Sequence, residues 1–149
     1  MATKQQLDAM AIADRLRPTL LRLGRELRRE KIAGVSSQQA GLLATIKYAP
    51  GVTVGELATE ERVSTAAMSK RISRLERDGL IVRTPSETDR RRVGLTLTEA
   101  GQHTLRRVRS RRTAWLAGRL GSLSPAELAA ISAAVEPLTG LAAGEEGGA

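Results

Sequence analysis

The sequence predicts a mainly α-helical fold with one small β-hairpin, on the basis of three observations. Apolar residues recur every three or four positions over most of the 149-residue chain, which is the period of helices that bury one face. A serine or threonine followed three residues later by Glu or Gln marks several helix starts as capping boxes. Only residues 80–98 combine a β-rich run with strict alternation around a polar segment, which is typical of two paired strands.

The first predicted helix covers about residues 7–30 and carries one narrow apolar stripe with arginines on its other faces. Pro18 interrupts the pattern, and we expect it to kink the helix or restart it there. The heptad-like spacing suits packing on the chain's own core or on a partner helix. The residues of this stripe are Ala13, Leu16, Leu20, Leu23 and Leu27.

Two short helices and a longer basic one are expected next, and together they predict a helix-turn-helix. Ala49-Pro50-Gly51 ends the first of them by turn chemistry, and Gly79 stands where a helix end takes up a left-handed residue. The expected caps are Ser36 with Gln39, Thr53 with Glu56, and Ser64. The expected buried residues are Leu42, Leu43 and Ile46, then Val54, Leu57 and Ala58, then Met68, Ile72 and Leu75.

The face of the basic helix opposite its buried stripe is the first candidate DNA-binding surface. Small residues near its start would let the helix enter a major groove, and the cations further along would contact phosphates. On an isolated helix, a solvated basic face would be the simpler interpretation, and the adjoining elements favour DNA. The residues on this face and its flanks are Thr65, Ala66, Ser69, Lys70, Arg71, Ser73, Arg74 and Arg77.

The two predicted strands, LIVRT at 80–84 and VGLTLT at 93–98, flank the polar connection PSETDRRR. Its three arginines, Arg90, Arg91 and Arg92, would occupy the tip of a hairpin beside the helix-turn-helix, which is the arrangement of a wing. Arginine is the side chain best matched to the negative potential of a minor groove. The alternative is an arginine-rich loop that keeps the protein in solution by charge. The sequence therefore predicts a winged helix-turn-helix.

The remaining chain predicts two further helices, the second with another narrow stripe. Thr98 is expected to cap the first, and Ser124 with Glu127 forms a capping box with Pro125 at the first helical position. The apolar candidates are Leu105, Val108, Trp115, Leu116 and Leu120 in the first helix, and Leu128, Ile131, Val135 and Leu138 in the second.

We expect one domain over residues 1–141, with a DNA-binding lobe at about 36–98 and terminal helices at about 7–30 and 104–140. The polar, glycine-rich tail at 142–149 is expected to be disordered. The stripes of the terminal helices could pack on each other within one chain. Because they lie outside a lobe that has its own small core, we expect them to build a homodimer instead.

Charge and composition narrow the function classes. The net charge is +8, and residues 60–112 carry 14 Lys+Arg against 7 Asp+Glu, which indicates a polyanionic partner. The chain has no cysteine and a single histidine, His103, so no metal site or catalytic triad is expected. No apolar run suits a signal peptide or a membrane span, which predicts a cytoplasmic protein without membrane contact. The carboxylate pairs at 60–61 and 145–146 are more simply surface, so we expect no enzyme and no cofactor.

Three stretches, VSSQQAGLLATI, VGELATEERVSTAAMSKRISRLERDGLIVRT and DRRRVGLTLTEAG, resemble the MarR family of bacterial regulators over roughly residues 7–140. The most specific parts are RLERDGL and the wing, D-x-R followed by LTLTEAG. The resemblance implies that Asp89 and Arg91 are the wing pair, in which the Asp89 carboxylate orients the side chain of Arg91 or of a neighbouring cation. It also implies that the recognition positions are Thr65, Ala66, Ser69, Lys70 and Arg71. Ala66 and Ala67 stand where the family often has proline and threonine. The absence of cysteine excludes the thiol-oxidation sensing of one branch.

The resemblance further implies a dimer that reads a palindromic operator in double-stranded DNA, and repression relieved by a small phenolic or aromatic ligand. In such a protein the ligand pocket lies between the dimer helices and the reading lobe. An equally good interpretation of the residues concerned is core leucines and solvated cations. The candidate ligand residues are Arg17, Leu20, Leu21, Leu43, Ile46 and Lys47.

One function of a different kind remains open, a nucleoid-type architectural protein that binds DNA without sequence preference. It explains the charge equally well but gives no reason for a wing beside a recognition helix. An RNA-binding protein is disfavoured, since one tryptophan, one tyrosine and no phenylalanine leave few side chains on which bases could stack.

Overall fold

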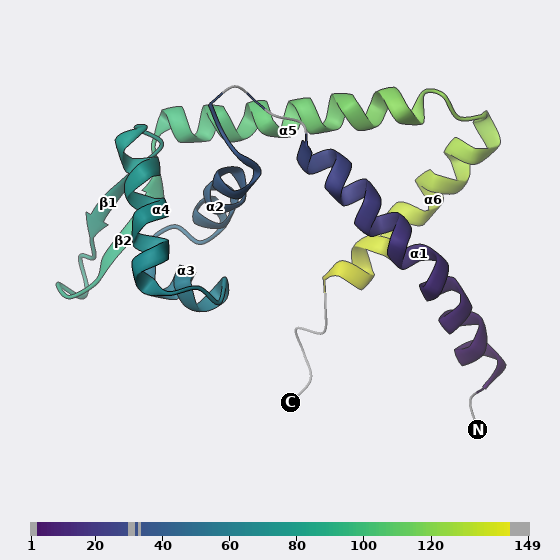
Figure 1. Cartoon of the computed structure of the whole chain (residues 1–149), viewed down its shortest axis with the longest axis horizontal. Coiled ribbons are helices and arrows are strands. Elements are labelled where there is room, and N and C mark those ends of the chain that lie inside the picture. Colours follow the sequence, from purple (N-terminus) through teal and green to yellow (C-terminus); the bar gives the residue numbers. More distant parts are fainter. Residues whose placement is uncertain (1–2, 30–31, 33, 144–149) are drawn as a thin grey trace. The chain divides into compact units, whose positions relative to one another are not determined.

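The computed structural model describes residues 3–29, 32 and 34–143 (Figure 1). These residues form helices and one two-stranded antiparallel sheet, which confirms the predicted fold class. The chain forms two compact units, Met1–Arg112 and Thr113–Ala149. The elements are α1 (Lys4–Arg29), α2 (Ser37–Tyr48), α3 (Val54–Glu60), α4 (Thr65–Arg77), β1 (Ile81–Pro85), β2 (Val93–Leu97), α5 (Glu99–Leu120) and α6 (Pro125–Ala142).

The helix starts of the lobe follow the predicted caps. In α2, the Ser36 hydroxyl accepts a hydrogen bond from the Gln39 amide (3.2 Å), and the Gln39 side chain accepts one from the Ser36 amide (2.9 Å). Thr53 and Glu56 make the same reciprocal pair at the start of α3. Each box satisfies two amides that the helix itself leaves without acceptors, so these starts are determined locally.

The core of the lobe lies between α2, α3, α4, the hairpin and the first turns of α5. Its buried side chains are all apolar among the described residues. Burial of each large apolar side chain contributes about 1.5–3 kcal/mol, so this cluster is the main source of the lobe's stability. The large side chains with at most 1% exposure are Leu42, Leu43, Ile46, Leu57, Met68, Ile72, Leu75, Ile81 and Leu95.

The hairpin is fixed to the turn between α2 and α3. Beyond the register that pairs Ile81 with Leu97 and Pro85 with Val93, Leu95 exchanges backbone hydrogen bonds with Gly51 (2.9 Å) and Val52 (2.8 Å). A Cβ atom at Gly94 would lie 2.7 Å from the Cα atom of Gly51, so this close approach requires glycine. The root of the hairpin is therefore attached to the helix-turn-helix through the main chain.

The junction from α4 to α5 explains why Gly79 precedes the hairpin and Thr98 follows it. Gly79 follows the end of α4 with φ of 72°, the left-handed conformation that the sequence predicts there. The Thr98 hydroxyl donates to the Gly79 carbonyl (2.6 Å) and accepts from the Gly101 amide (3.0 Å), which confirms Thr98 as the cap of α5. A Cβ atom at Gly101 would lie 2.0 Å from the carbonyl oxygen of Leu80, so no other residue fits.

The terminal helices α1 and α6 contain no buried residue in the single chain. Of the two outcomes expected at Pro18, a kink or a restart, the restart does not occur, because α1 continues from Lys4 to Arg29 with the proline inside it. α6 starts at the predicted capping box, where Ser124 accepts from the Glu127 amide (3.3 Å). It extends to Ala142, and the rest of the predicted tail, residues 144–149, lies outside the described residues. Within the described part of the chain, no helix has the length and apolarity needed to cross a membrane.

Candidate nucleic-acid interface

Helix α4 presents the surface that the sequence predicts. Met68, Ile72 and Leu75 are fully buried, which turns the opposite side of the helix outward. Thr65, Ala66, Lys70, Arg74 and Arg77 are exposed there, while Ser69, Arg71 and Ser73 are partly buried at the edges of this face. The small residues lie in the first turn and the cations follow. The start of the helix therefore carries short side chains, and its later turns carry positive charge.

Two of the edge residues on α4 are held by neighbouring elements. The guanidinium of Arg71 lies 3.4 Å from the carboxylate of Glu61, which follows α3. Arg83 on β1 donates to Glu76 of α4 at 2.6 Å and to the Ser73 hydroxyl at 3.4 Å. Lys70, Arg74 and Arg77, by contrast, form none of the ion pairs found among the described residues.

A hollow of about 270 Å³ separates the start of α2 from α4. Lys70, Arg71 and Arg74 line one side, and Ser36, Gln38, Gln39 and Leu42 line the other. Cations and side-chain amides are donors that suit a phosphate oxygen. The polar residues of α2 therefore extend the candidate interface, and the sequence pattern gave no sign of them beyond the capping box.

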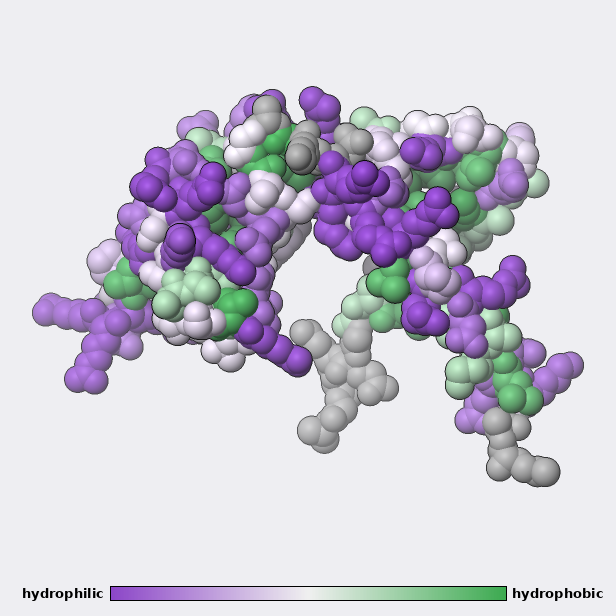
Figure 2. All heavy atoms as spheres, viewed as in Figure 1, coloured by the Kyte–Doolittle hydropathy of each residue, from purple (hydrophilic) through white to green (hydrophobic). Residues whose placement is uncertain are grey.

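The loop of the hairpin has a defined conformation. The Ser86 amide donates to the Arg92 carbonyl (2.8 Å), and the Arg92 amide donates to the Asp89 carbonyl (3.0 Å). The Ser86 hydroxyl accepts hydrogen bonds from the amides of Thr88 (3.3 Å) and Asp89 (3.2 Å). In Figure 2 this end of the lobe projects as a hydrophilic surface. The wing is thus a preformed element rather than a structureless loop.

Asp89 supports an arginine in a different way from the one expected. Its carboxylate accepts a hydrogen bond from the main-chain amide of Arg91 at 3.0 Å. None of the ion pairs among the described residues involves Asp89, so the expected contact with a guanidinium is not present. The carboxylate fixes the backbone at Arg91, and the side chains of Arg90 and Arg91 are exposed.

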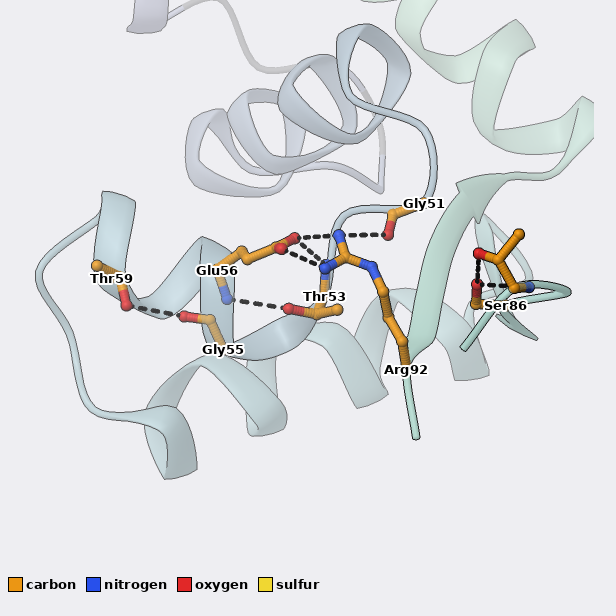
Figure 3. Close-up of polar contacts among 8 residues, drawn as sticks. Gly51, Thr53, Gly55, Glu56, Thr59, Ser86 and Arg92 are labelled. Atoms are coloured by element: carbon orange, nitrogen blue, oxygen red, sulfur yellow. Dashed lines mark hydrogen bonds and ion pairs between the residues drawn. The ribbon is translucent and has the colours of Figure 1, made fainter. Parts of the chain in front are cut away.

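Arg92 differs from the other two wing arginines, because its side chain is engaged within the protein (Figure 3). It lies 2.6 Å and 2.9 Å from the two carboxylate oxygens of Glu56 on α3, and 3.5 Å from the carbonyl oxygen of Gly51. The backbone hydrogen bond from Thr53, and after it the hydrogen bond from Arg92, lower the pKa of Glu56. Glu56 therefore stays ionised and joins the start of α3 to the wing.

Of the six candidate ligand residues, two lie in the core of the lobe and four are exposed in the single chain. Leu43 and Ile46 are fully buried in the core of the lobe. Arg17, Leu20 and Leu21 are exposed on α1, and Lys47 is exposed on α2. The cavities at the start of α2 and on the two sides of the wing are lined by none of the six.

Sequence patterns missed two groups of the interface, Glu56 as the partner of Arg92, and Arg83 as the partner of Ser73 and Glu76. Both pairs join residues of different elements, so neither has a signal in local spacing. The described residues also contain no cluster of three or more His, Asp or Glu side chains that could hold a metal ion.

Comparison with known proteins adds independent evidence. A sequence model described as the MarR family matches residues 33–92, which include α2, α3, α4, β1 and the loop that follows it, and end just before β2. An HTH-type transcriptional regulator of Mycobacterium tuberculosis is 34% identical over 117 residues, which are 78% of this chain and 82% of that protein. The HTH-type transcriptional repressor MdtR of Bacillus subtilis is 32% identical over 123 residues, 83% of this chain and 76% of the repressor.

Solved structures agree over almost the full length. The crystal structure of a transcriptional regulator protein from Pseudomonas aeruginosa has a TM-score of 0.77 and 34% identity, and the match covers 96% of this chain and all of that one. Streptococcus pneumoniae FabT, solved in complex with DNA, has a TM-score of 0.57 and 25% identity, with coverages of 93% and 96%. The similarity therefore extends beyond the lobe to the terminal helices.

Proposed function

Because the chain belongs to the MarR family of HTH-type transcriptional regulators, which are DNA-binding proteins and not enzymes, we propose that it represses transcription by binding one operator sequence specifically. The observation that carries the proposal is the pairing of α4 with a preformed wing. The exposed face of α4 starts with small residues and continues with Lys70, Arg74 and Arg77, and the wing presents Arg90 and Arg91 beside it.

We assign the contacts by the chemistry of each side chain. Ser69 and Lys70, with Thr65, Ala66 and Arg71 around them, read base edges in the major groove. Arg74 and Arg77 contact phosphates, which position the protein without carrying sequence information. Arg90 and Arg91 reach the adjacent minor groove. Asp89 fixes the backbone of the wing by accepting the hydrogen bond from the Arg91 amide.

The assembly we propose is a homodimer on a palindromic operator, in the cytoplasm where the DNA is. The apolar stripes of α1 and α6 are exposed in the single chain, and 43% to 57% of the surface of Leu128, Ile131 and Val135 is accessible. A second copy would cover them. A two-fold dimer places its recognition helices about 34 Å apart, one turn of DNA, so each reads one half-site.

Release by a small aromatic or phenolic ligand is a further part of the proposal, and its support is the family resemblance. The exposed candidates Leu20, Leu21, Arg17 and Lys47 offer apolar surface and cations for an aromatic carboxylate or phenolate. Trp115, the single tryptophan, serves as a probe. Ligand release is refuted when salicylate and related phenolic compounds neither change its fluorescence nor dissociate the DNA complex.

The test of specific binding starts from a duplex selected from a random-sequence pool with the wild-type protein. We expect this duplex to bind about a thousandfold or more tightly than a scrambled one at the same salt concentration. Lys70→Ala should reduce the free energy of binding to the selected duplex by roughly 1–3 kcal/mol, and to the scrambled duplex by less, because it removes a base contact. Lys4→Ala, on exposed α1, is the control that removes an equal charge elsewhere.

The architectural alternative makes the opposite prediction. A protein that binds by charge alone would show a ratio of about tenfold or less between selected and scrambled duplex. Lys70→Ala and Lys4→Ala would then weaken binding to both duplexes equally. Footprinting on the protein's own upstream region would also show no protected site.

A further inference from the structure

The three consecutive wing arginines have different surroundings, and this difference has a functional consequence. Arg92 makes two short contacts with the Glu56 carboxylate, at 2.6 Å and 2.9 Å, and approaches the Gly51 carbonyl at 3.5 Å (Figure 3). Arg90 and Arg91 are exposed, and their side chains take part in none of the ion pairs among the described residues. A guanidinium that bridges both oxygens of a carboxylate is held in orientation as well as in position.

Glu56 is itself fixed from the other side. It is the third residue of the α3 capping box, and its carboxylate accepts a hydrogen bond from the Thr53 amide at 2.9 Å. The capping box therefore fixes the position of the Glu56 carboxylate independently of Arg92. The pair connects α3 with the residue that precedes β2, two segments that are 36 positions apart in the sequence.

The opposite strand of the hairpin has an equivalent attachment. Arg83 on β1 contacts Glu76 of α4 at 2.6 Å and Ser73 at 3.4 Å. One arginine therefore attaches β1 to the recognition helix, and another attaches the start of β2 to α3. Between them, the residues from Glu87 to Arg91 are exposed to solvent.

We propose that Glu56 and Arg92 are a positioning pair, which holds the wing at a fixed place beside the recognition helix so that Arg90 and Arg91 meet the minor groove while α4 lies in the major groove. The proposal rests on the proposed function as a sequence-specific DNA-binding protein. Arg92 acts through Glu56 and is not itself a phosphate contact, contrary to its place among the expected DNA-binding residues.

Electrostatics alone leads to different expectations for this pair. A carboxylate near an approaching polyanion repels it, so its removal should tighten DNA binding, and removal of Arg92 should weaken binding to every sequence. A positioning pair behaves otherwise. Loss of either member should weaken binding to the selected duplex, loss of both should be no worse than loss of one, and the number of phosphate contacts should not change.

The experiment uses the full-length protein, the selected and scrambled duplexes, and a series of salt concentrations. The variants are Glu56→Gln, Arg92→Ala, their double substitution, and Arg91→Ala. Glutamine keeps the acceptor for the Thr53 amide, since Gln also serves in capping boxes, and removes only the charge. Arg91→Ala is the matched control, because it deletes the neighbouring arginine whose side chain is exposed.

We expect Glu56→Gln, Arg92→Ala and the double variant each to lower affinity for the selected duplex by about fivefold, a small effect because the pair is partly exposed. Their salt slopes should equal that of the wild type. Arg91→Ala should lower the slope by about one unit on both duplexes. The proposal is overturned by tighter binding of Glu56→Gln, by additive losses in the double variant, or by a slope about one unit lower for Arg92→Ala.

Arg92→Lys separates geometry from charge. A lysine can satisfy a phosphate but cannot reproduce the two-point contact with a carboxylate. If Arg92 and Glu56 are a positioning pair, Arg92→Lys should show the same fivefold loss of affinity for the selected duplex as Arg92→Ala. If Arg92 contacts a phosphate, Arg92→Lys should restore the affinity. Thermal unfolding of each variant, measured first, selects a temperature at which all are folded.

A measurement without DNA keeps this proposal distinct from the proposed function. Amide hydrogen exchange at residues 86–92 should be faster in Glu56→Gln and Arg92→Ala than in the wild type, and unchanged in Arg91→Ala. Equal exchange in all four proteins overturns the pair. A wild-type protein that binds selected and scrambled duplexes equally overturns the proposed function instead, and leaves the exchange result to decide on the pair.

Discussion

The DNA-binding lobe and the terminal helices contain similar apolar residues but use them differently within one chain. Met68, Ile72 and Leu75 of α4 are fully buried, whereas α1 and α6 have no buried residue at all. Leu20 and Val135, for example, keep 48% and 57% of their surface accessible. The lobe is therefore stabilised by contacts within the chain, while the terminal helices have apolar faces whose burial needs a further surface. Four predictions, three on substitutions and one on pH, test this contrast in order of decreasing expected effect.

Gly101→Ala should damage the lobe most. The added Cβ atom would lie 2.0 Å from the main-chain carbonyl oxygen of Leu80, and the position of a Cβ atom is fixed by its own backbone, so no side-chain rotation can relieve the overlap. We expect a loss of about 3 kcal/mol or more in the free energy of unfolding, measured with urea. Gly41→Ala is the control, because its Cβ meets nothing within 4 Å inside α2, and it should stabilise by about 0.5–1 kcal/mol. Equal effects of the two would mean that the α4–α5 junction is not tightly packed.

Val135→Asp should act on assembly and leave the lobe intact. A charge on the α6 stripe would be buried by a second copy, so we expect dimer dissociation to increase about thirtyfold or more by light scattering. Unfolding of the lobe should change by less than about 0.5 kcal/mol. Ala133→Asp places the same charge on the opposite, exposed side of α6 and should leave the dimer unchanged. A wild-type protein that is monomeric at micromolar concentration would refute the homodimer.

Asp89→Ala tests how the lobe presents its wing. The substitution removes the acceptor of the Arg91 amide, and we expect operator affinity to fall about fivefold although a negative charge is lost. Asp89→Asn is the control, because its side-chain oxygen can still accept that hydrogen bond, so it should bind at least as tightly as the wild type. On a purely solvated loop both variants would bind DNA more tightly. That result, with Arg91→Ala unchanged, would show that the hairpin is not a wing.

Acidification should give the smallest effect and should distinguish the two regions. Hydrogen bonds at the helix starts lower the pKa of Glu56 in α3 and of Glu127 in α6. A carboxyl with a lowered pKa stabilises the folded state above its unfolded pKa of about 4.3, and this contribution is lost as the pH falls through the folded value. Glu56→Gln should therefore flatten the acid dependence of lobe unfolding. Glu127→Gln should flatten only that of dimer dissociation. The division into two regions would be contradicted if Glu56→Gln changed the acid dependence of dimer dissociation and Glu127→Gln that of lobe unfolding.

Local rules explain why so much of the lobe could be predicted from the sequence. Capping boxes at Ser36, Thr53 and Ser124 involve residues three positions apart, and the α4 stripe follows the helical period, so both are visible in the chain itself. At Pro18 the pattern left a kink and a restart open, and only the restart is excluded, because a proline inside a helix can be tolerated when the helix continues on both sides. Its missing amide removes one hydrogen bond without ending α1.

Long-range pairings set the limit of the prediction. Nothing in the sequence indicates that Arg92, and not Arg90 or Arg91, would meet Glu56, because that choice depends on how the hairpin is attached to the α2–α3 turn. The placement of Asp89 was predicted, but its partner is a main-chain amide and not a guanidinium. Leu43 and Ile46 were named as candidates for a ligand pocket, and they are core residues without accessible surface. The candidate DNA-contact and ligand residues stay predictions until binding is measured.

The junction at Gly101 also has a mechanical consequence. Leu80, the third residue after α4, is in contact with the first turn of α5, and its carbonyl accepts a hydrogen bond from the Thr98 amide at 3.0 Å. The Thr98 hydroxyl also donates to the carbonyl of Gly79, the second residue after α4. The end of α4 and the start of α5 are thus joined by direct hydrogen bonds and close main-chain packing. We therefore expect a rotation imposed on the first turns of α5 to be passed on to the recognition helix through these contacts.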